Sequence, residues 1–301
     1  MTDVPPPSGS GGADSSSGAA RFGPGAGIGK PHAPAPEPLP ATVFDSHCHL
    51  DMIDLPVAEV LIEADAAGIA RVVTIGCDVP SSRWAADCAA VFPKVAAAVA
   101  IHPNETAAAA SSKAEQEAVL AEIARLAALP QVRAVGETGL DYYRDSAPLE
   151  VQREWFRAHI DIAKQTGKAL MIHDREAHED VLAILAADGA PEQVIFHCFS
   201  GDADFAARCA TAGYVLSFAG TVTFANAAAL RAAAAAVPVE LILAETDAPF
   251  LAPAPNRGRA NSPAQVANTV RTLAEVRQMD IAKLCAVIEA TGERVFGPWQ
   301  V

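Results

Sequence analysis

The chain has 301 residues, 51% of them hydrophobic, and a net charge of −14 at pH 7. This size permits one large domain or two ordinary ones. The acidic balance excludes non-specific binding to polyphosphate through a basic surface, so any nucleic-acid contact must be local. No apolar run approaches the ~20 residues of a membrane helix, and the six cysteines lack zinc-ribbon or redox spacing. The sequence therefore predicts a reduced, cytoplasmic protein without a membrane segment, and it leaves the oligomeric state open.

Residues 1–40 differ in composition from the rest of the chain. They hold nine of the 22 prolines, many Gly and Ser residues and almost no large apolar side chain. Such a segment buries too little apolar surface to offset its ordering entropy. We expect a disordered tail over 1–40, with His32 solvated, followed by one domain over 41–301.

Short apolar runs without polar alternation recur along the domain, which is typical of parallel strands covered by helices on both faces. The runs are Thr42–Asp45, Arg71–Gly76, Val95–Ile101, Val132–Gly136, Ala169–His173, Val194–His197, Tyr214–Phe218 and Leu241–Ala244.

Ala-rich segments with helical spacing separate these runs, for example at Val57–Ala67, Ala114–Ala128, Val151–Thr166 and Ala225–Ala236. Two more helices are expected after the eighth run, at about Pro263–Arg277 and Ile281–Phe296. Eight βα units in ~250 residues favour a (β/α)₈ TIM-type barrel with extra C-terminal helices. An open doubly wound sheet is the alternative.

Residue types that bind metals follow the strand runs. The first run leads into His47, Cys48 and His49. Side chains two apart on a strand share a face, so both imidazoles can point into the mouth of a barrel while Cys48 packs on the other side. Further candidates come at the ends of the fourth, fifth, sixth and eighth runs: Glu137, His173, His197 and Asp247.

Each of these residues alone has an ordinary explanation, such as a helix cap or a hydrogen-bonded core histidine. Together they would require six independent polar intrusions at one end of the barrel. Four imidazoles and two carboxylates can hold two divalent ions if one carboxylate bridges them, and the mixed ligand set accepts Zn²⁺, Mn²⁺, Co²⁺ or Mg²⁺. Asp247 can also accept a proton from an attacking water.

Other polar residues near these strand ends suggest supporting roles. Arg175 and Arg257 follow ligand-bearing strand ends and are candidates for phosphate contacts. His102 either faces the substrate or caps the third strand. Glu245 lies two residues before Asp247, so it shares the same face and could orient a ligand histidine as a hydrogen-bond acceptor.

The chain resembles the TatD family of metal-dependent deoxyribonucleases, within the wider group of amidohydrolase-like barrels. The resemblance covers about 42–297 and is carried by FDSHCHLD at 44–51, GETGLDYYR at 136–144, IHDRE at 172–176, FHCFSG at 196–201 and ETDAPFL at 245–251.

The resemblance implies two ligand sets that share a bridging carboxylate, Glu137. One set is His47, His49, Glu137 and Asp247, and the other is Glu137, His173 and His197. Two motifs depart from the family pattern: His102-Pro103-Asn104 stands where His-Pro-His is common, and Ala260 replaces a basic residue.

Three classes of function are compatible with these residues. The first is a two-metal phosphodiesterase that acts on DNA. The second is an amidohydrolase-type hydrolase of a small molecule, which the acidic charge favours, because fold alone does not select the bond that is cleaved. The third, a non-catalytic binding protein, would leave clustered carboxylates and imidazoles without a cation.

Overall fold

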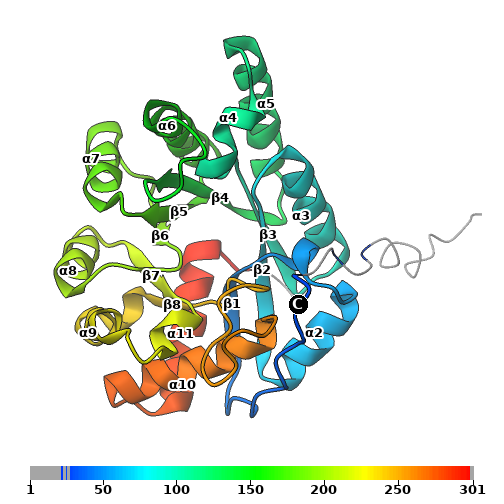
Figure 1. Ribbon diagram of the computed structural model, residues 1–301, viewed down its shortest axis with the longest axis vertical. Helices are drawn as coiled ribbons and strands as arrows, with labels where there is room; N and C mark the ends of the chain where they lie inside the picture. Colours follow the sequence, from blue (N-terminus) through cyan, green and yellow to red (C-terminus); the bar gives the residue numbers. More distant parts are fainter. Residues whose placement is uncertain (1–21, 23–24, 26–27, 299–301) are drawn as a thin grey trace, which may run out of the picture.

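The protein is described by a computed structural model that covers residues 22, 25 and 28–298. Eight parallel strands are hydrogen-bonded in sequence order, from β1 to β8, and form a nearly closed barrel (Figure 1). Since the strand order never reverses, the barrel is confirmed and the open doubly wound sheet was wrong. The strands are β1 (Val43–Cys48), β2 (Ile69–Gly76), β3 (Val95–Val99), β4 (Val132–Asp141), β5 (Ala169–Arg175), β6 (Val194–Phe196), β7 (Val215–Phe218) and β8 (Ile242–Ala244).

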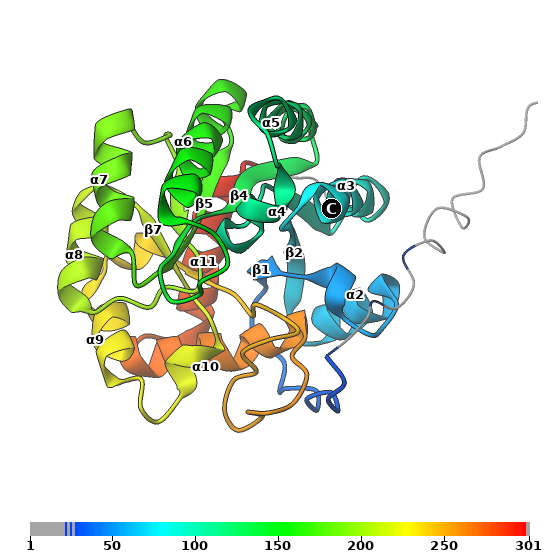
Figure 2. The same cartoon turned by 45° about the horizontal axis from the view of Figure 1, so that its top comes forward.

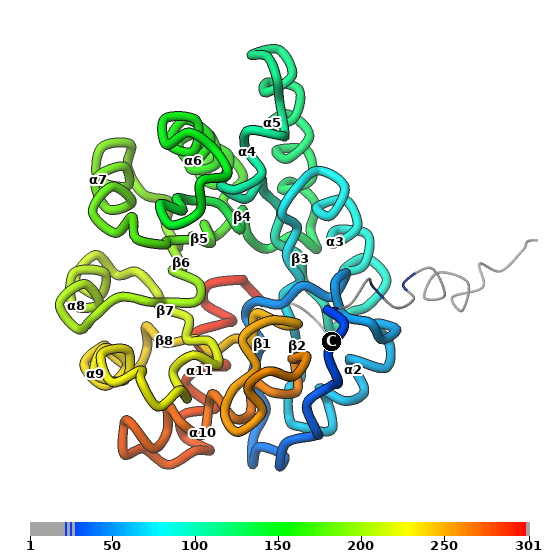
Figure 3. The backbone as a smooth tube through the Cα atoms, viewed as in Figure 1, coloured from blue at the N-terminus to red at the C-terminus, as the bar shows by residue number. Residues whose placement is uncertain are grey.

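Helices alternate with the strands and surround them, as the backbone tube shows (Figure 3). They are α2 (Val57–Ala66), α3 (Val79–Val91), α4 (Thr106–Ala109), α5 (Lys113–Ala127), α6 (Leu149–Thr166), α7 (His178–Asp188), α8 (Ala203–Thr211), α9 (Ala228–Ala236), α10 (Val266–Arg277) and α11 (Ile281–Phe296). The last two are the expected extra C-terminal helices. Within the described ranges, none of the helices is long and apolar enough to cross a membrane.

The chain segment after β8 joins the two edges of the barrel. The amide of Asp247 donates to the carbonyl of His47 (2.9 Å), and the amide of His49 donates to the carbonyl of Ala248 (2.7 Å). The buried carboxylate of Asp45 accepts from the amide of Thr246 (2.9 Å). Closure therefore takes place at the carboxyl ends of β1 and β8, where the candidate ligands lie.

Helix α11 covers the opposite end of the barrel and appears in red near the barrel axis (Figure 1). Gly292 allows this packing, because a Cβ there would lie 2.7 Å from the ring of Phe44. The guanidinium of Arg71 lies 4.2 Å from the same ring and forms ion pairs with Glu289 and Glu293 of α11. The end of the barrel covered by α11 therefore serves stability, and the functional residues of such barrels lie at the opposite end, where the strands have their carboxyl termini.

Strand β4 is longer than its apolar run suggested. The apolar run was expected to end at Gly136. The structure extends the strand to Asp141, since β4 continues to pair with β5 up to the Asp141–Arg175 partners. Glu137 therefore lies inside a strand, at the register irregularity between the residues Val135 and Thr138 that pair with β5.

The expected tail over 1–40 is corrected in its last part. Residues 31–33 lie beside the loop after β8 (Figure 2), where the Ala33 amide donates to the Ala260 carbonyl (3.0 Å). The ring of His32, expected to be solvated, lies 2.5 Å from Asp54. Phe22 is buried against Trp84 and Phe92. The rest of the expected tail, 1–21, 23–24 and 26–27, lies outside the described residues.

Candidate metal centre

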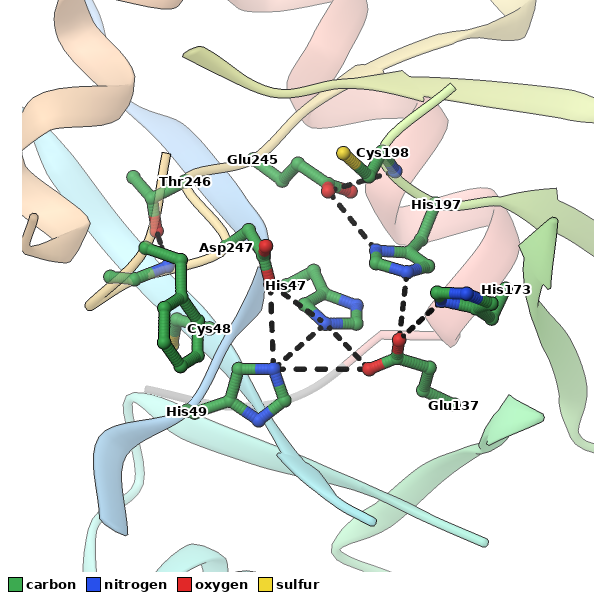
Figure 4. A network of polar contacts seen from close by, with 12 residues as sticks. His47, Cys48, His49, Glu137, His173, His197, Cys198, Glu245, Thr246 and Asp247 are labelled. Carbon is green, nitrogen blue, oxygen red and sulfur yellow. Dashed lines mark hydrogen bonds and ion pairs between the residues drawn. The ribbon is translucent and has the colours of Figure 1, made fainter. Parts of the chain in front are cut away.

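Six candidate ligands converge at the carboxyl ends of the strands (Figure 4). They come from five chain segments that are far apart in sequence, which is why only the closed barrel brings them together. His47 lies on β1 and His49 directly after it, Glu137 on β4, His173 on β5, His197 directly after β6, and Asp247 three residues after β8.

One half of the cluster surrounds Oε2 of Glu137. This oxygen lies 3.3 Å from Nε2 of His47 and 3.8 Å from Nε2 of His49. Oδ1 of Asp247 lies 3.6 Å and 3.4 Å from the same two nitrogens. Each of the two imidazole nitrogens thus lies within 4 Å of one carboxylate oxygen of Glu137 and one of Asp247.

The other half surrounds Oε1 of Glu137. Nδ1 of His173 lies 2.9 Å away and Nε2 of His197 lies 3.0 Å away. Nε2 of His102 lies 3.2 Å from the same oxygen. A single carboxylate therefore faces a different group of imidazoles with each of its oxygens.

Two glycines explain how β4 carries Glu137 into this position. A Cβ at Gly136 would lie 2.5 Å from Cβ of Met171, and one at Gly139 would lie 2.1 Å from the carbonyl oxygen of His173. Gly139 also has a φ of 141°, which side chains disfavour. Glycine at both positions lets β4 and β5 approach closely, so that Glu137 and His173 meet.

The second nitrogen of several imidazoles is held by the protein. Nδ1 of His197 lies 3.2 Å from Oε1 of Glu245, and that oxygen also accepts from the Cys198 amide (2.9 Å). Nδ1 of His47 lies 3.1 Å from Sδ of Met171. When the imidazole is neutral, as metal binding requires, contacts of this kind place the hydrogen on Nδ1 and direct the Nε2 lone pair into the site.

Asp141 plays the same part for His173 and was not assigned a role from sequence. Its Oδ2 lies 3.1 Å from Nε2 of His173, and its Oδ1 accepts from the amides of Tyr143 and Arg144. The available signal was spacing, since Asp141 lies four residues after Glu137 and so shares its face of the strand.

Burial and charge act in opposite directions on the pKa values of these groups. Burial alone would raise the pKa of Glu137, but the charges of His197 and His102 hold it well below its ordinary value. Burial would lower the pKa of His197, yet Glu137 and Glu245 raise it well above 6.5. Glu137 is therefore ionised, and the proton on His197 balances its charge.

This donor set fits divalent cations. Nitrogen and oxygen donors in groups of three lie within 4.8 Å of one another, in the sets His47–Glu137–His197, His47–His49–Asp247 and His102–Glu137–His173. A cation can take over the charge balance now supplied by protons, because imidazole must be neutral to bind metal. A set that includes His102 was not expected from the sequence.

The remaining predicted residues lie in different surroundings. His102 also caps the turn after β3, since its Nδ1 accepts from the Asn104 amide (3.0 Å). The guanidinium of Arg175 stacks over Tyr143 and that of Arg257 over Phe224, at 3.9 and 4.1 Å from the ring centroids. Both arginines therefore belong to the surface around the cluster and not to the ligand groups.

The comparisons with known proteins agree with this geometry. Residues 44–297 match the family of TatD-related DNases. The chain is 45% identical to an uncharacterized metal-dependent hydrolase, TatD, from Mycobacterium tuberculosis, over 85% of this chain and 98% of that protein. It is 34% identical to the metal-dependent hydrolase YcfH from Escherichia coli, over 84% and 95% of the two chains. The crystal structure of YjjV, a TatD homologue from E. coli, is similar with a TM-score of 0.79 and 25% identity, over 85% of this chain and 98% of that one.

Proposed function

The chain belongs to the TatD-related DNase family and is a metal-dependent hydrolase, and from this premise we propose that it hydrolyses phosphodiester bonds in DNA with two divalent cations. The ligands of one cation are His47, His49, Glu137 and Asp247. Those of the other are Glu137, His173 and His197. The cations are Mg²⁺, Mn²⁺ or Zn²⁺.

The observation that carries the proposal is the position of Glu137. One of its oxygens faces His47 and the other faces His173 and His197, at 2.9 to 3.3 Å. A carboxylate that presents separate oxygens to separate imidazole groups suits a bridge between two cations. A mononuclear centre would need only one of the two halves.

When bound, such cations supply a water of lowered pKa and neutralise charge on the phosphate oxygens of a displacement reaction. The chain's own residues do the remaining work. Asp247 accepts the proton of the attacking water on its carboxylate. Burial would raise the pKa of Asp247, but the hydrogen bond with His49 and the charge of His47 lower it, so the carboxylate is ionised and ready to accept a proton.

The positioning residues keep the imidazoles in one tautomer. Glu245 holds His197 and Asp141 holds His173, so each directs its other nitrogen toward Glu137. His102 faces Oε1 of Glu137, as His173 and His197 do, and can contact either the cation on that side or a substrate oxygen. Arg175 and Arg257, on the rim, contact phosphates that flank the one being cleaved.

A second candidate function is the hydrolysis of a small molecule by the same centre, as in amidohydrolases. The net charge of −14 favours it, because a strongly acidic protein repels long polyanions. Both functions use the same ligands, so only the substrate separates them.

The test compares three substrates for the metal-loaded protein: single-stranded DNA, duplex DNA and a panel of small carboxylic esters and amides. We expect DNA cleavage that chelation abolishes and that added Mg²⁺ or Mn²⁺ restores. Turnover of the small esters or amides without cleavage of either DNA would overturn the proposal in favour of the second candidate. The variant Glu137→Gln is the control against a contaminating nuclease.

A further inference from the structure

We infer that a pocket beside the metal centre, completed by the N-terminal segment, binds an unpaired nucleotide of a single-stranded DNA substrate. This inference rests on the proposed deoxyribonuclease function and names the part of the substrate that the site recognises. The pocket has a volume of about 330 Å³. That lies at the lower end of the roughly 300–1,000 Å³ found for small-ligand sites, which suits about one nucleotide unit.

Three separate parts of the chain form the pocket. The N-terminal segment, the turn after β7 and the loop after β8 each contribute side chains. The charged and aromatic residues of the lining are Lys30, Phe224, Phe250, Arg257 and Arg259.

The pocket adjoins the metal centre through Phe250, which lines it. Phe250 follows the ligand Asp247 by three residues, and its ring centroid lies 6.2 Å from that of His49. Phe250 is nevertheless 42% exposed, although it is a large apolar side chain. The ring therefore lies within reach of a DNA strand whose scissile phosphate is at the cations.

The charge of the pocket is opposite to that of the protein as a whole. Lys30, Arg257 and Arg259 are exposed, and no carboxylate in the described part of the chain forms an ion pair with any of them. They form a local group of cations on a chain of net charge −14. Three unpaired cations in one pocket favour an anionic ligand with several phosphates.

The aromatic rings indicate that the ligand is single-stranded. Arg257 stacks on Phe224, so a guanidinium plane and an aromatic ring lie together in one wall of the pocket. Phe250 offers a second ring. Cations beside exposed aromatic rings are the usual means of binding single strands, because unpaired bases stack on the rings while the phosphates meet the charges. Duplex DNA would keep its bases stacked inside the helix.

Backbone and side-chain hydrogen bonds hold the N-terminal segment of the pocket in place. The amide of Ala260 donates to the carbonyl of Pro31 (2.9 Å), and the amide of Ala33 donates to the carbonyl of Ala260 (3.0 Å). Nη1 of Arg259 donates to the carbonyl of His32 (3.2 Å). These bonds fix the segment that carries Lys30 against the loop after β8 (Figure 2). The segment precedes the residues 44–297 that match the family, so the pocket is completed by a part of the chain outside that match.

The experiment measures equilibrium binding to the metal-loaded protein by fluorescence anisotropy. The probe is a fluorescein-labelled, phosphorothioate-linked single strand, which resists hydrolysis during the measurement. We expect Lys30→Ala to raise Kd and to reduce the slope of log Kd against log salt by about 0.7, the value for one phosphate contact on a single strand. Phe250→Ala should raise Kd about tenfold through the loss of one stacked base. Lys283→Ala, on exposed surface of α11, is the matched control and should leave both quantities unchanged.

Two results would overturn the inference. One is wild-type affinity and salt slope in both Lys30→Ala and Phe250→Ala. The other is equally tight binding of duplex and single-stranded probes. If the wild type cleaves DNA while these variants bind normally, the pocket assignment fails and the proposed function stands. If the wild type neither binds the probe nor cleaves DNA, the proposed function itself fails.

Discussion

His197 and Glu245 are in direct contact at the metal centre: Nδ1 of the imidazole lies 3.2 Å from Oε1 of the carboxylate. Both residues are buried, and the other nitrogen of His197 lies 3.0 Å from Glu137. Glu245 therefore acts on the centre through His197, by fixing the orientation and tautomer of its ring.

The first prediction concerns Glu245→Ala. Removal of the carboxylate frees the ring of His197, so we expect metal affinity to fall by about 10- to 100-fold, the usual cost of losing such a partner. Titration calorimetry with Mn²⁺ measures it. Glu245→Gln keeps an oxygen that can accept from His197 and should lose less. Wild-type affinity in Glu245→Ala would show that the ring is held by packing alone.

The second prediction concerns the proton acceptor. Asp247→Asn keeps the size of the side chain but removes the charge that accepts a proton from water. We expect kcat to fall by at least ~10²-fold, the scale of general-base loss. Rates must be measured at saturating metal, so that weaker ligation is compensated. If excess metal restores the rate to near that of the wild type, Asp247 is only a replaceable ligand.

The third prediction is a pH dependence of stability from His159. This fully buried ring accepts from the Ile101 amide through Nε2 (3.1 Å), and its Nδ1 donates to the Trp155 carbonyl (2.7 Å). Both nitrogens are thus used by the neutral ring, and burial lowers the pKa of His159 from 6.5 to about 4.

The unfolded chain binds a proton at this residue below pH ~6.5, whereas the folded protein binds it only near pH ~4. The free energy of unfolding should therefore fall between those values, by about 3 kcal/mol in total, and level off below them. Urea titrations of the wild type and His159→Gln at several pH values isolate the effect. Parallel pH profiles for the two proteins would contradict it.

Much of the fold could be predicted from the sequence because its elements are locally encoded. Each strand is a short apolar run, and Ala-rich helical segments separate the runs. The convergence of His47 and Asp247 followed from topology, since the carboxyl ends of parallel strands meet at one end of a barrel.

Other features depend on contacts that have no periodic signal. The length of β4 depends on its pairing with β5 beyond Gly136. His102 reaches Glu137 through a turn whose direction the sequence does not specify. Phe22 is a single aromatic residue in a segment rich in Gly and Pro. The sequence around it has no apolar periodicity that would predict its burial against Trp84.

The fourth prediction follows from that buried ring. Phe22 is only 3% exposed and packs edge-on against Trp84 and Phe92, at centroid distances of 5.3 and 5.7 Å. Phe22→Ala should lower the free energy of unfolding by about 3 kcal/mol, the scale of a buried Phe truncation. Deletion of residues 1–40 should lower Tm as well. An unchanged Tm in both proteins would restore the expectation of a disordered tail over 1–40.

The last prediction tests the bridge. Glu137 lies within 3.3 Å of imidazoles from both halves of the centre, and a bridging carboxylate screens two cations that would otherwise repel each other across ~4 Å. Glu137→Gln keeps the size but removes the charge, so both sites should weaken. His173→Ala removes a ligand from one half only and should spare the other site.

Equilibrium dialysis with metal analysis, at fixed free metal and pH, should give about two ions per chain for the wild type, one for His173→Ala, and well below two for Glu137→Gln. The wild type saturating at one ion, with Glu137→Gln unaffected, would replace the two-metal mechanism by a mononuclear one, because the two oxygens of Glu137 would then serve a single cation and its proton-bearing neighbours.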